Sequence, residues 1–287
     1  MTARFVARPA GAEAYTLGEG PVWDPDRNRL LWVDIQGGTV HAGSVAPGRI
    51  HVTDTWEFDD LACVVAVSAA GELLVAQRGE VVEIGLDGAR TPRADLSRAG
   101  SRLNDGGVDP QGRFLVGGMA LDDSRGTQTL VRLDGDAVTV LDDDLTLSNG
   151  LAWSPDGGTL YSVDSIPGVI YGRDYPDGER RELFRITDGL PDGLCVDAIG
   201  NLWIANHGLG RVEGRTPSGQ LLAVVEVDAA HPTSCAFAGP ELDILVITTA
   251  TEGMTPAELT RQPASGRLFT AAVGATGLRT PYWNRYR

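Results

Sequence analysis

The sequence predicts an all-β protein: a six-bladed β-propeller with four-stranded antiparallel blades around a central channel. A unit of two apolar strands, joined by a turn of Asp, Pro, Ala or Gly residues, recurs six times along the 287 residues. Consecutive units are 41 to 45 residues apart, a spacing typical of propeller blades. The anchor residues that mark the end of each first strand are Trp23, Val67, Val108, Trp153, Val196 and Phe237.

The unit is clearest between Thr146 and Ser162. Its first strand ends at Trp153, the sequence Ser-Pro-Asp-Gly forms the turn, and a second strand follows over Thr159–Val163. Before the first unit, residues Arg4 to Arg8 alternate apolar and polar and have no blade of their own. We expect this strand to clasp the last blade, formed by Asp243–Thr249 and Arg267–Val273, and to close residues 1–287 into a single domain.

The third unit carries the densest polar cluster, with Arg102, Asn104 and Asp105 on a segment that enters an inner strand. Alternate residues of a strand face the same way, so Arg102 and Asn104 should share a direction. The alternative is a polar turn whose side chains bond their own backbone. The connection 120–128 that follows is either a lid over the channel or a solvated loop, and His207 is either a structural hydrogen-bonding residue or a substrate contact. The terminal sequence TPYWNRYR is expected to pack on the surface.

Composition limits the classes of partner. The 24 basic residues are all Arg, against 39 acidic ones, for a net charge of −15. Such an acidic chain is not expected to bind nucleic acid or an anionic membrane, and no protein partner is inferred. Cys63, Cys195 and Cys235 have neither zinc-site spacing nor the pattern of a disulfide framework. No apolar run approaches 18 residues, so we expect a cytoplasmic protein.

The repeat also predicts where chemistry takes place. The residues four positions before each anchor should form a ring around the channel axis, because the innermost strands line the channel. They are Glu19, Cys63, Asn104, Asn149, Asp192 and Thr233. Two carboxylates, Glu19 and Asp192, and the amide oxygen of Asn149 form an oxygen-rich set that suits one divalent cation. Calcium is the expected ion, with magnesium, manganese or zinc as alternatives, and a purely structural ion or ordered water is the competing interpretation.

The sequence also resembles the SMP-30/gluconolactonase/regucalcin family. The resemblance rests on LGEGPVWDPDRNRLLWVDI at 17–35, NDGGVDPQGRFLVGGM at 104–119, SNGLAWSPDGGTLYSVDS at 148–165, PDGLCVDAIGNLWIA at 191–205, and TSCAF with RQPASGRLF. It implies a six-bladed propeller with one catalytic metal held by Glu19, Asn149 and Asp192. It implies that Arg102 and Asn104 bind substrate. Asp122, a shorter acid than the family's Glu, takes the remaining substrate position.

These observations together predict metal-dependent hydrolysis of a sugar-acid lactone, such as gluconolactone, arabinonolactone or xylonolactone, with Asp192 as the general base. Two alternatives stay open. One is another ester or phosphotriester hydrolase on the same metal site. The other is a propeller that binds calcium or sugar without catalysis.

Overall fold

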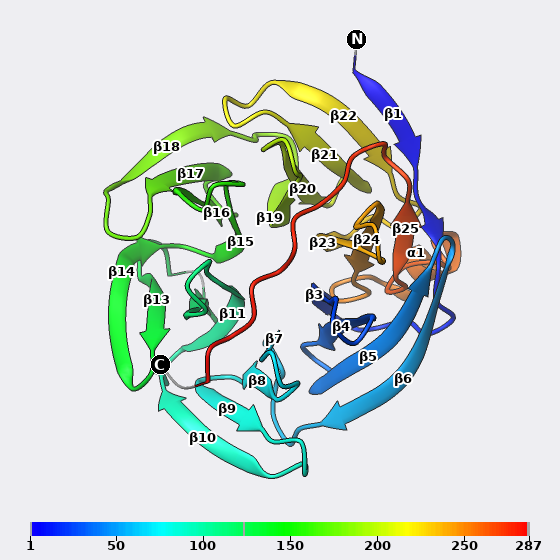
Figure 1. Cartoon of the computed structure of the whole chain (residues 1–287). Coiled ribbons are helices and arrows are strands. Elements are labelled where there is room, and N and C mark those ends of the chain that lie inside the picture. Colours follow the sequence, from blue (N-terminus) through cyan, green and yellow to red (C-terminus); the bar gives the residue numbers. More distant parts are fainter. Residues whose placement is uncertain (1, 123, 286–287) are drawn as a thin grey trace.

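Six sheets surround a common axis, as the sequence predicts (Figure 1). The computed structural model describes residues 2–122 and 124–285. The first three blades contain β3 (Gly18–Asp24), β4 (Arg29–Asp34), β5 (Thr39–Ala46) and β6 (Arg49–Glu57); β7 (Val64–Val67), β8 (Leu73–Ala76), β9 (Glu80–Ile84) and β10 (Arg90–Asp95); and β11 (Ser101–Val108), β12 (Phe114–Ala120), β13 (Gln128–Asp134) and β14 (Ala137–Leu145).

The other three blades complete the ring. They contain β15 (Ser148–Trp153), β16 (Thr159–Asp164), β17 (Val169–Asp174) and β18 (Arg180–Arg185); β19 (Leu190–Val196), β20 (Leu202–His207), β21 (Arg211–Arg215) and β22 (Leu221–Glu226); and β23 (Pro232–Ala238), β24 (Ile244–Thr249) and β25 (Phe269–Ala271). A short helix, α1 (Pro256–Arg261), begins at a Thr255 capping box in the connection between β24 and β25.

The N-terminal segment pairs with two blades instead of one. β1 (Ala3–Val6) runs parallel to β22 at the edge of the fifth blade, and β2 (Arg8–Pro9) pairs antiparallel with β25 as the fourth strand of the last blade. The change of partner takes place at Ala7, whose N–H donates to Glu226 O at 2.8 Å, before Ala10 donates to Leu268 O. The expected strand over Arg4 to Arg8 therefore divides, and only its end meets the last blade. The N-terminal segment thus supplies the outermost strand of both the fifth and the sixth blades.

Hydrophobic side chains fill the spaces between neighbouring blades. Trp23, Trp32, Phe114 and Phe269 are fully buried, and each lies on a strand of its blade where alternate residues face the next sheet. The inner strand β7 is buried at every position. This packing fixes the inner strands, and therefore fixes the side chains that face the channel. Within the described residues, no helix is long and apolar enough to cross a membrane.

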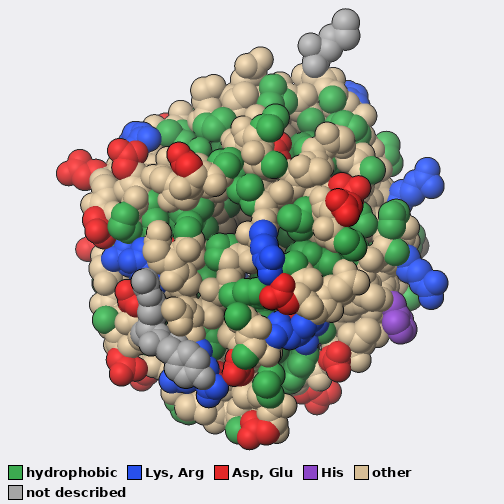
Figure 2. Space-filling model, in the orientation of Figure 1, with side chains coloured by type: hydrophobic (Ala, Val, Ile, Leu, Met, Phe, Trp, Pro, Cys, Tyr) green, Lys and Arg blue, Asp and Glu red, His purple; other side chains and the backbone are tan. Residues whose placement is uncertain are grey.

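The C-terminal segment, residues 272–285, crosses the face of the propeller that lies opposite the start of the inner strands. It is the red chain in Figure 1. Trp283 N–H donates to Val67 O at 2.9 Å, and the Tyr282 hydroxyl donates to buried Asp24 at 3.0 Å. Figure 2 shows hydrophobic side chains gathered near the middle of this face, with charged ones mostly nearer its edge. The expected surface tail thus spans the channel; its last two residues, 286–287, lie outside the described residues.

Candidate functional site

The inner strands carry a bulge at the same level in five blades. The pairing register shifts between Glu19 and Val22 in β3, and between Asn149 and Leu151 in β15. Corresponding shifts occur in β11, β19 and β23. A bulge leaves residues unpaired and redirects their side chains, and here it does so where each inner strand begins. The repeated bulge is the local device that aims polar side chains at the axis.

A glycine directly follows Glu19, Asp105, Asn149 and Asp192, and after the last three a Cβ atom would clash with a neighbouring atom. Gly150 has φ of +24°, and a Cβ there would lie 2.6 Å from the carbonyl oxygen of Asp192. At Gly193 a Cβ would lie 2.1 Å from Ser234 Oγ, and at Gly106 it would lie 2.4 Å from Leu115 O. At Gly150 and Gly193 the inner strands of neighbouring blades approach so closely that no side chain fits, and at Gly106 the clash is with β12 of the same blade.

Glu19, Asp192 and Asp105 form a buried acidic group. Burial first, and then the negative charges of Asp192 and Asp105, raise the pKa of Glu19 well above its usual value. Burial and the charge of Asp105 likewise raise the pKa of Asp192, which the Asn149 amide partly offsets. Burial raises the pKa of Asp105 to about 6. Side chains from blades one, three and five, with Asn149 of blade four, therefore lie close enough to shift one another's pKa.

The oxygens of this group are only partly satisfied. Asp192 is 8% exposed, and its Oδ1 has no hydrogen-bond partner among the described residues. Glu19 accepts through Oε2 from Gly20 N–H at 2.9 Å, and Asn149 Oδ1 accepts only a long bond of 3.3 Å from Gly150 N–H. Buried carboxylate oxygens without donors are costly unless a cation lies beside them. The donor set therefore fits a hard divalent ion.

The described residues contain no group of three Asp, Glu, His or Cys side chains placed to hold a metal ion. The proposed ligand set has two carboxylates, so it depends on the Asn149 amide for its third oxygen. The Asn149 side chain is held for this by its Nδ2, which donates to Ser165 Oγ at 3.1 Å. Its Oδ1 is thereby turned away from Ser165.

Arg102 and Asn104 lie together beside the acidic group. Arg102 Nη1 donates to Asn104 Oδ1 at 2.8 Å, and Asn104 Nδ2 donates to Ser148 O at 3.0 Å. Both polar atoms of the Asn104 amide are therefore engaged, and the residue joins blade three to the start of β15. The charge of Arg102 lowers the pKa of both Glu19 and Asp192, which opposes the effect of burial.

The remaining predicted residues occupy different surroundings. Asp122 is exposed, accepts from Ser124 N–H at 2.8 Å and lines an open cavity with Arg102. Cys63 is buried beside Arg102, and burial raises its pKa to about 11, so it is a thiol at neutral pH. Thr233 is buried and donates to Gly18 O. In the predicted ring, Cys63 and Thr233 are therefore buried structural residues rather than part of the acidic group.

Asp105 is the residue that the spacing missed. Four positions before Val108 lies Asn104, yet the side chain that acts on Glu19 and Asp192 belongs to Asp105. Blade three has one residue fewer between its acid and its anchor than the first, fourth and fifth blades. The signal that finds it is the Gly directly after it, which Glu19, Asn149 and Asp192 also have.

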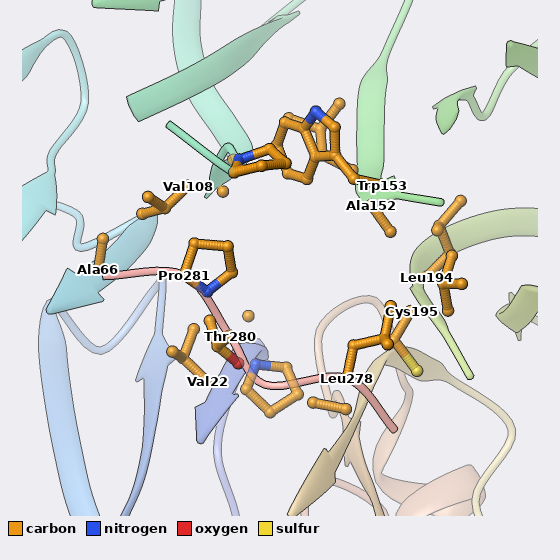
Figure 3. Close-up of a pocket in the computed structure, with 18 of the residues that line it drawn as sticks. Val22, Ala66, Val108, Ala152, Trp153, Leu194, Cys195, Leu278, Thr280 and Pro281 are labelled. Carbon is orange, nitrogen blue, oxygen red and sulfur yellow. The ribbon is translucent and has the colours of Figure 1, made fainter. Parts of the chain in front are cut away.

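Two cavities lie on either side of the acidic group. An apolar chamber of about 390 Å³ extends along the channel from Asp105 and is lined by Val22, Val108 and Leu194 (Figure 3). Leu278, Thr280 and Pro281 of the C-terminal segment lie across it. The other cavity, of about 540 Å³, opens at the start of the inner strands, where Arg102 and Asp122 line it. This second cavity, which we call the mouth, adjoins the acidic group through Arg102, whose charge acts on Glu19 and Asp192.

Residues 17–251 match the family described as the SMP-30/gluconolactonase/LRE-like region. The chain belongs to this family. Among relatives, a 6-deoxy-6-sulfogluconolactonase of Pseudomonas putida is 34% identical over 92% of this chain and 94% of its own, and the pentonolactonase XacC of Haloferax volcanii is 35% identical over 91% and 92%. The solved structure of a calcium-binding protein, regucalcin, from Agrobacterium tumefaciens matches with a TM-score of 0.91 and 26% identity, covering 99% of both chains.

The family membership agrees with the resemblance seen in the motifs, and the matched region 17–251 contains the whole acidic group. β1, β2 and the C-terminal segment across the channel lie outside the matched residues. The family region therefore supplies the site, while these outer segments close the ring and the far end of its channel.

Proposed function

We propose that this SMP-30/gluconolactonase/LRE-like protein hydrolyses the lactone of a sugar acid to the free acid, using one divalent cation. The observation that carries the proposal is the buried Asp192 Oδ1, for which the described part of the chain supplies no hydrogen-bond donor although it lies beside Glu19 and Asp105. The relatives named as lactonases support the substrate class.

Glu19, Asn149 and Asp192 would hold the cation. Calcium is the expected ion because all three ligands are oxygens, and magnesium, manganese or zinc would also accept this set. When bound, a divalent cation supplies Lewis-acid polarisation of the lactone carbonyl and makes water more acidic. The name of the regucalcin structure is consistent with calcium.

The chain's own residues carry out the proton transfer and hold the substrate. Asp192 Oδ1 accepts a proton from the attacking water while the water oxygen forms a bond to the lactone carbonyl carbon. The ring C–O bond then breaks, and the departing oxygen takes up the proton held by Asp192 to become a hydroxyl group, which restores the Asp192 carboxylate. Arg102, fixed by Asn104, donates to substrate oxygens, and Asp122 accepts from hydroxyl groups at the mouth.

The decisive experiment replaces the proposed base. Asp192→Ala should lower kcat/KM for gluconolactone or arabinonolactone by about 100-fold or more, the usual contribution of a general base. Acid release is followed with a pH indicator and corrected for spontaneous hydrolysis. Melting temperature and circular dichroism show whether the variant remains folded. A folded variant with full activity would remove Asp192 from the mechanism.

A second candidate function is cation binding without catalysis, which the calcium-binding structural relative favours. Cation binding and turnover, both measured on the wild-type protein, separate the two functions. A wild-type protein that binds calcium tightly, and hydrolyses neither a panel of aldonolactones nor a phosphotriester, would support binding alone. Faster turnover of the phosphotriester than of every lactone would instead indicate a different hydrolase on this site.

A further inference from the structure

The mouth has an acidic side opposite Arg102. Residues of three blades line the mouth. Gln36 lies in the β4–β5 turn of blade one, Arg102 and Asp122 belong to blade three, and Glu252 follows β24 of the last blade. Gln36, Asp122 and Glu252 are exposed, whereas Arg102 is buried. A substrate that occupies this cavity meets these side chains.

Gln36 and Glu252 act as a pair. Gln36 Nε2 donates to Glu252 Oε1 at 2.6 Å, across the seam between the first and last blades. Backbone bonds fix the Glu252 segment, because the N–H groups of Thr251 and Glu252 both donate to Thr16 O. The pair therefore presents Gln36 Oε1 and Glu252 Oε2 as acceptors, which match the hydroxyl groups of an uncharged polyol chain.

The charges of the mouth are unbalanced. Asp122 and Glu252 are both carboxylates, and Arg102 is the one basic residue among the described residues that line this cavity. Arg102 already donates to Leu103 O and Asn104 Oδ1. An anionic group on the distal end of a substrate would therefore meet the two exposed carboxylates at the rim, whereas the one basic side chain of the described lining, Arg102, is buried.

We infer that Glu252, held by Gln36, is a specificity-determining residue that accepts hydroxyl groups of uncharged sugar lactones and rejects lactones whose distal carbon carries a phosphate or sulfonate. This inference rests on the proposed function. It adds a residue outside the acidic group and the family motifs, and it assigns the substrate class by charge.

The test compares glucono-δ-lactone with its 6-phosphate. Glu252→Gln keeps the shape of the side chain and removes its charge. It should raise the ratio of kcat/KM for the 6-phosphate to kcat/KM for gluconolactone by about 5- to 10-fold, the effect of one charge near a solvated rim. Added salt should raise wild-type turnover of the 6-phosphate and have less effect on the variant.

Glu241→Gln is the matched control. Glu241 is exposed on the β23–β24 hairpin of the same blade, at the opposite face. This substitution therefore removes an equal charge at a position far from the mouth. If Glu252→Gln changes the preference between the two lactones no more than Glu241→Gln does, the inference is wrong.

Binding of the products separates this inference from the proposed function. Gluconate and 6-phosphogluconate are titrated calorimetrically into both variants with calcium present, which needs no turnover. A wild type that hydrolyses no lactone would contradict the proposed function alone, while a selective gain in 6-phosphogluconate affinity in Glu252→Gln would still support the role of Glu252. An equal affinity change in both variants would overturn it.

Discussion

Arg102 Nη1 donates a 2.8 Å hydrogen bond to Asn104 Oδ1, and this contact ties the Arg102 guanidinium beside the acidic group to the seam between blades three and four. The two residues are two positions apart on β11, so the strand itself places both side chains on one side. The pair shows how the site is built: a side chain aimed by the strand is held by a hydrogen bond to a neighbouring blade.

Arg102→Met should lower kcat/KM for lactones by about 10- to 100-fold, because it removes charged hydrogen bonds and leaves buried Asn104 Oδ1 without a donor. Arg102→Lys keeps the charge but loses the planar guanidinium, so it should recover only part of the activity. Steady-state kinetics on both variants check this. Equal activity of Lys and wild type would show that the charge alone matters.

Gly150→Ala should destabilise the fold by about 1–3 kcal/mol, because its backbone has positive φ and a Cβ would meet Asp192 O. It should also lower activity, since Asp192 must move. Gly253→Ala is the control: it too has positive φ, but no atom lies within 4 Å of its Cβ position. Urea unfolding measures both. Equal losses of stability and activity in the two variants would contradict a role for close blade contact.

Tyr282→Phe should lower the free energy of unfolding by about 1 kcal/mol through loss of its hydrogen bond to buried Asp24. The C-terminal segment lies at the far end of the channel, so kcat/KM should remain unchanged. Chemical denaturation and lactone kinetics on one preparation test this. A loss of activity with unchanged stability would place the segment in the reaction instead.

His207 should make stability depend on pH. Burial, with the stacked His231 beside it, lowers the pKa of His207 from 6.5 to about 4. Between these values the unfolded chain binds a proton that the folded protein does not, so this residue's contribution is full above pH 6.5 and is lost as the pH falls towards 4. The difference in melting temperature between pH 7.5 and pH 5 should be smaller in His207→Gln. An unchanged difference would rule out this residue.

The repeat predicted the six blades because each anchor ends an inner strand at the same turn, and side-chain packing between blades requires that regularity. Counting by the same repeat selected the wrong residue in blade three. In blade three the bulge leaves both Asn104 and Asp105 unpaired, so counting back from Val108 reached the hydrogen-bonding amide instead of the acid.

Other features depend on contacts that a strand pattern does not encode. A strand forms at β1, but it pairs with β22 of blade five, and only β2 pairs with β25 of blade six. The C-terminal segment has no periodicity, and its path across the channel follows from single bonds such as that between Trp283 and Val67. The mouth pair of Gln36 and Glu252 joins residues 216 positions apart.

The most direct test of the central claim titrates calcium into chelated protein while binding heat and gluconolactone hydrolysis are measured in parallel, with magnesium, manganese and zinc in separate runs. We predict that one cation binds per chain and that activity returns over the same concentration range. Both responses should be lost in Glu19→Gln and Asn149→Ala. Full lactonase activity in chelated protein, or unchanged cation binding in both variants, would contradict the claim.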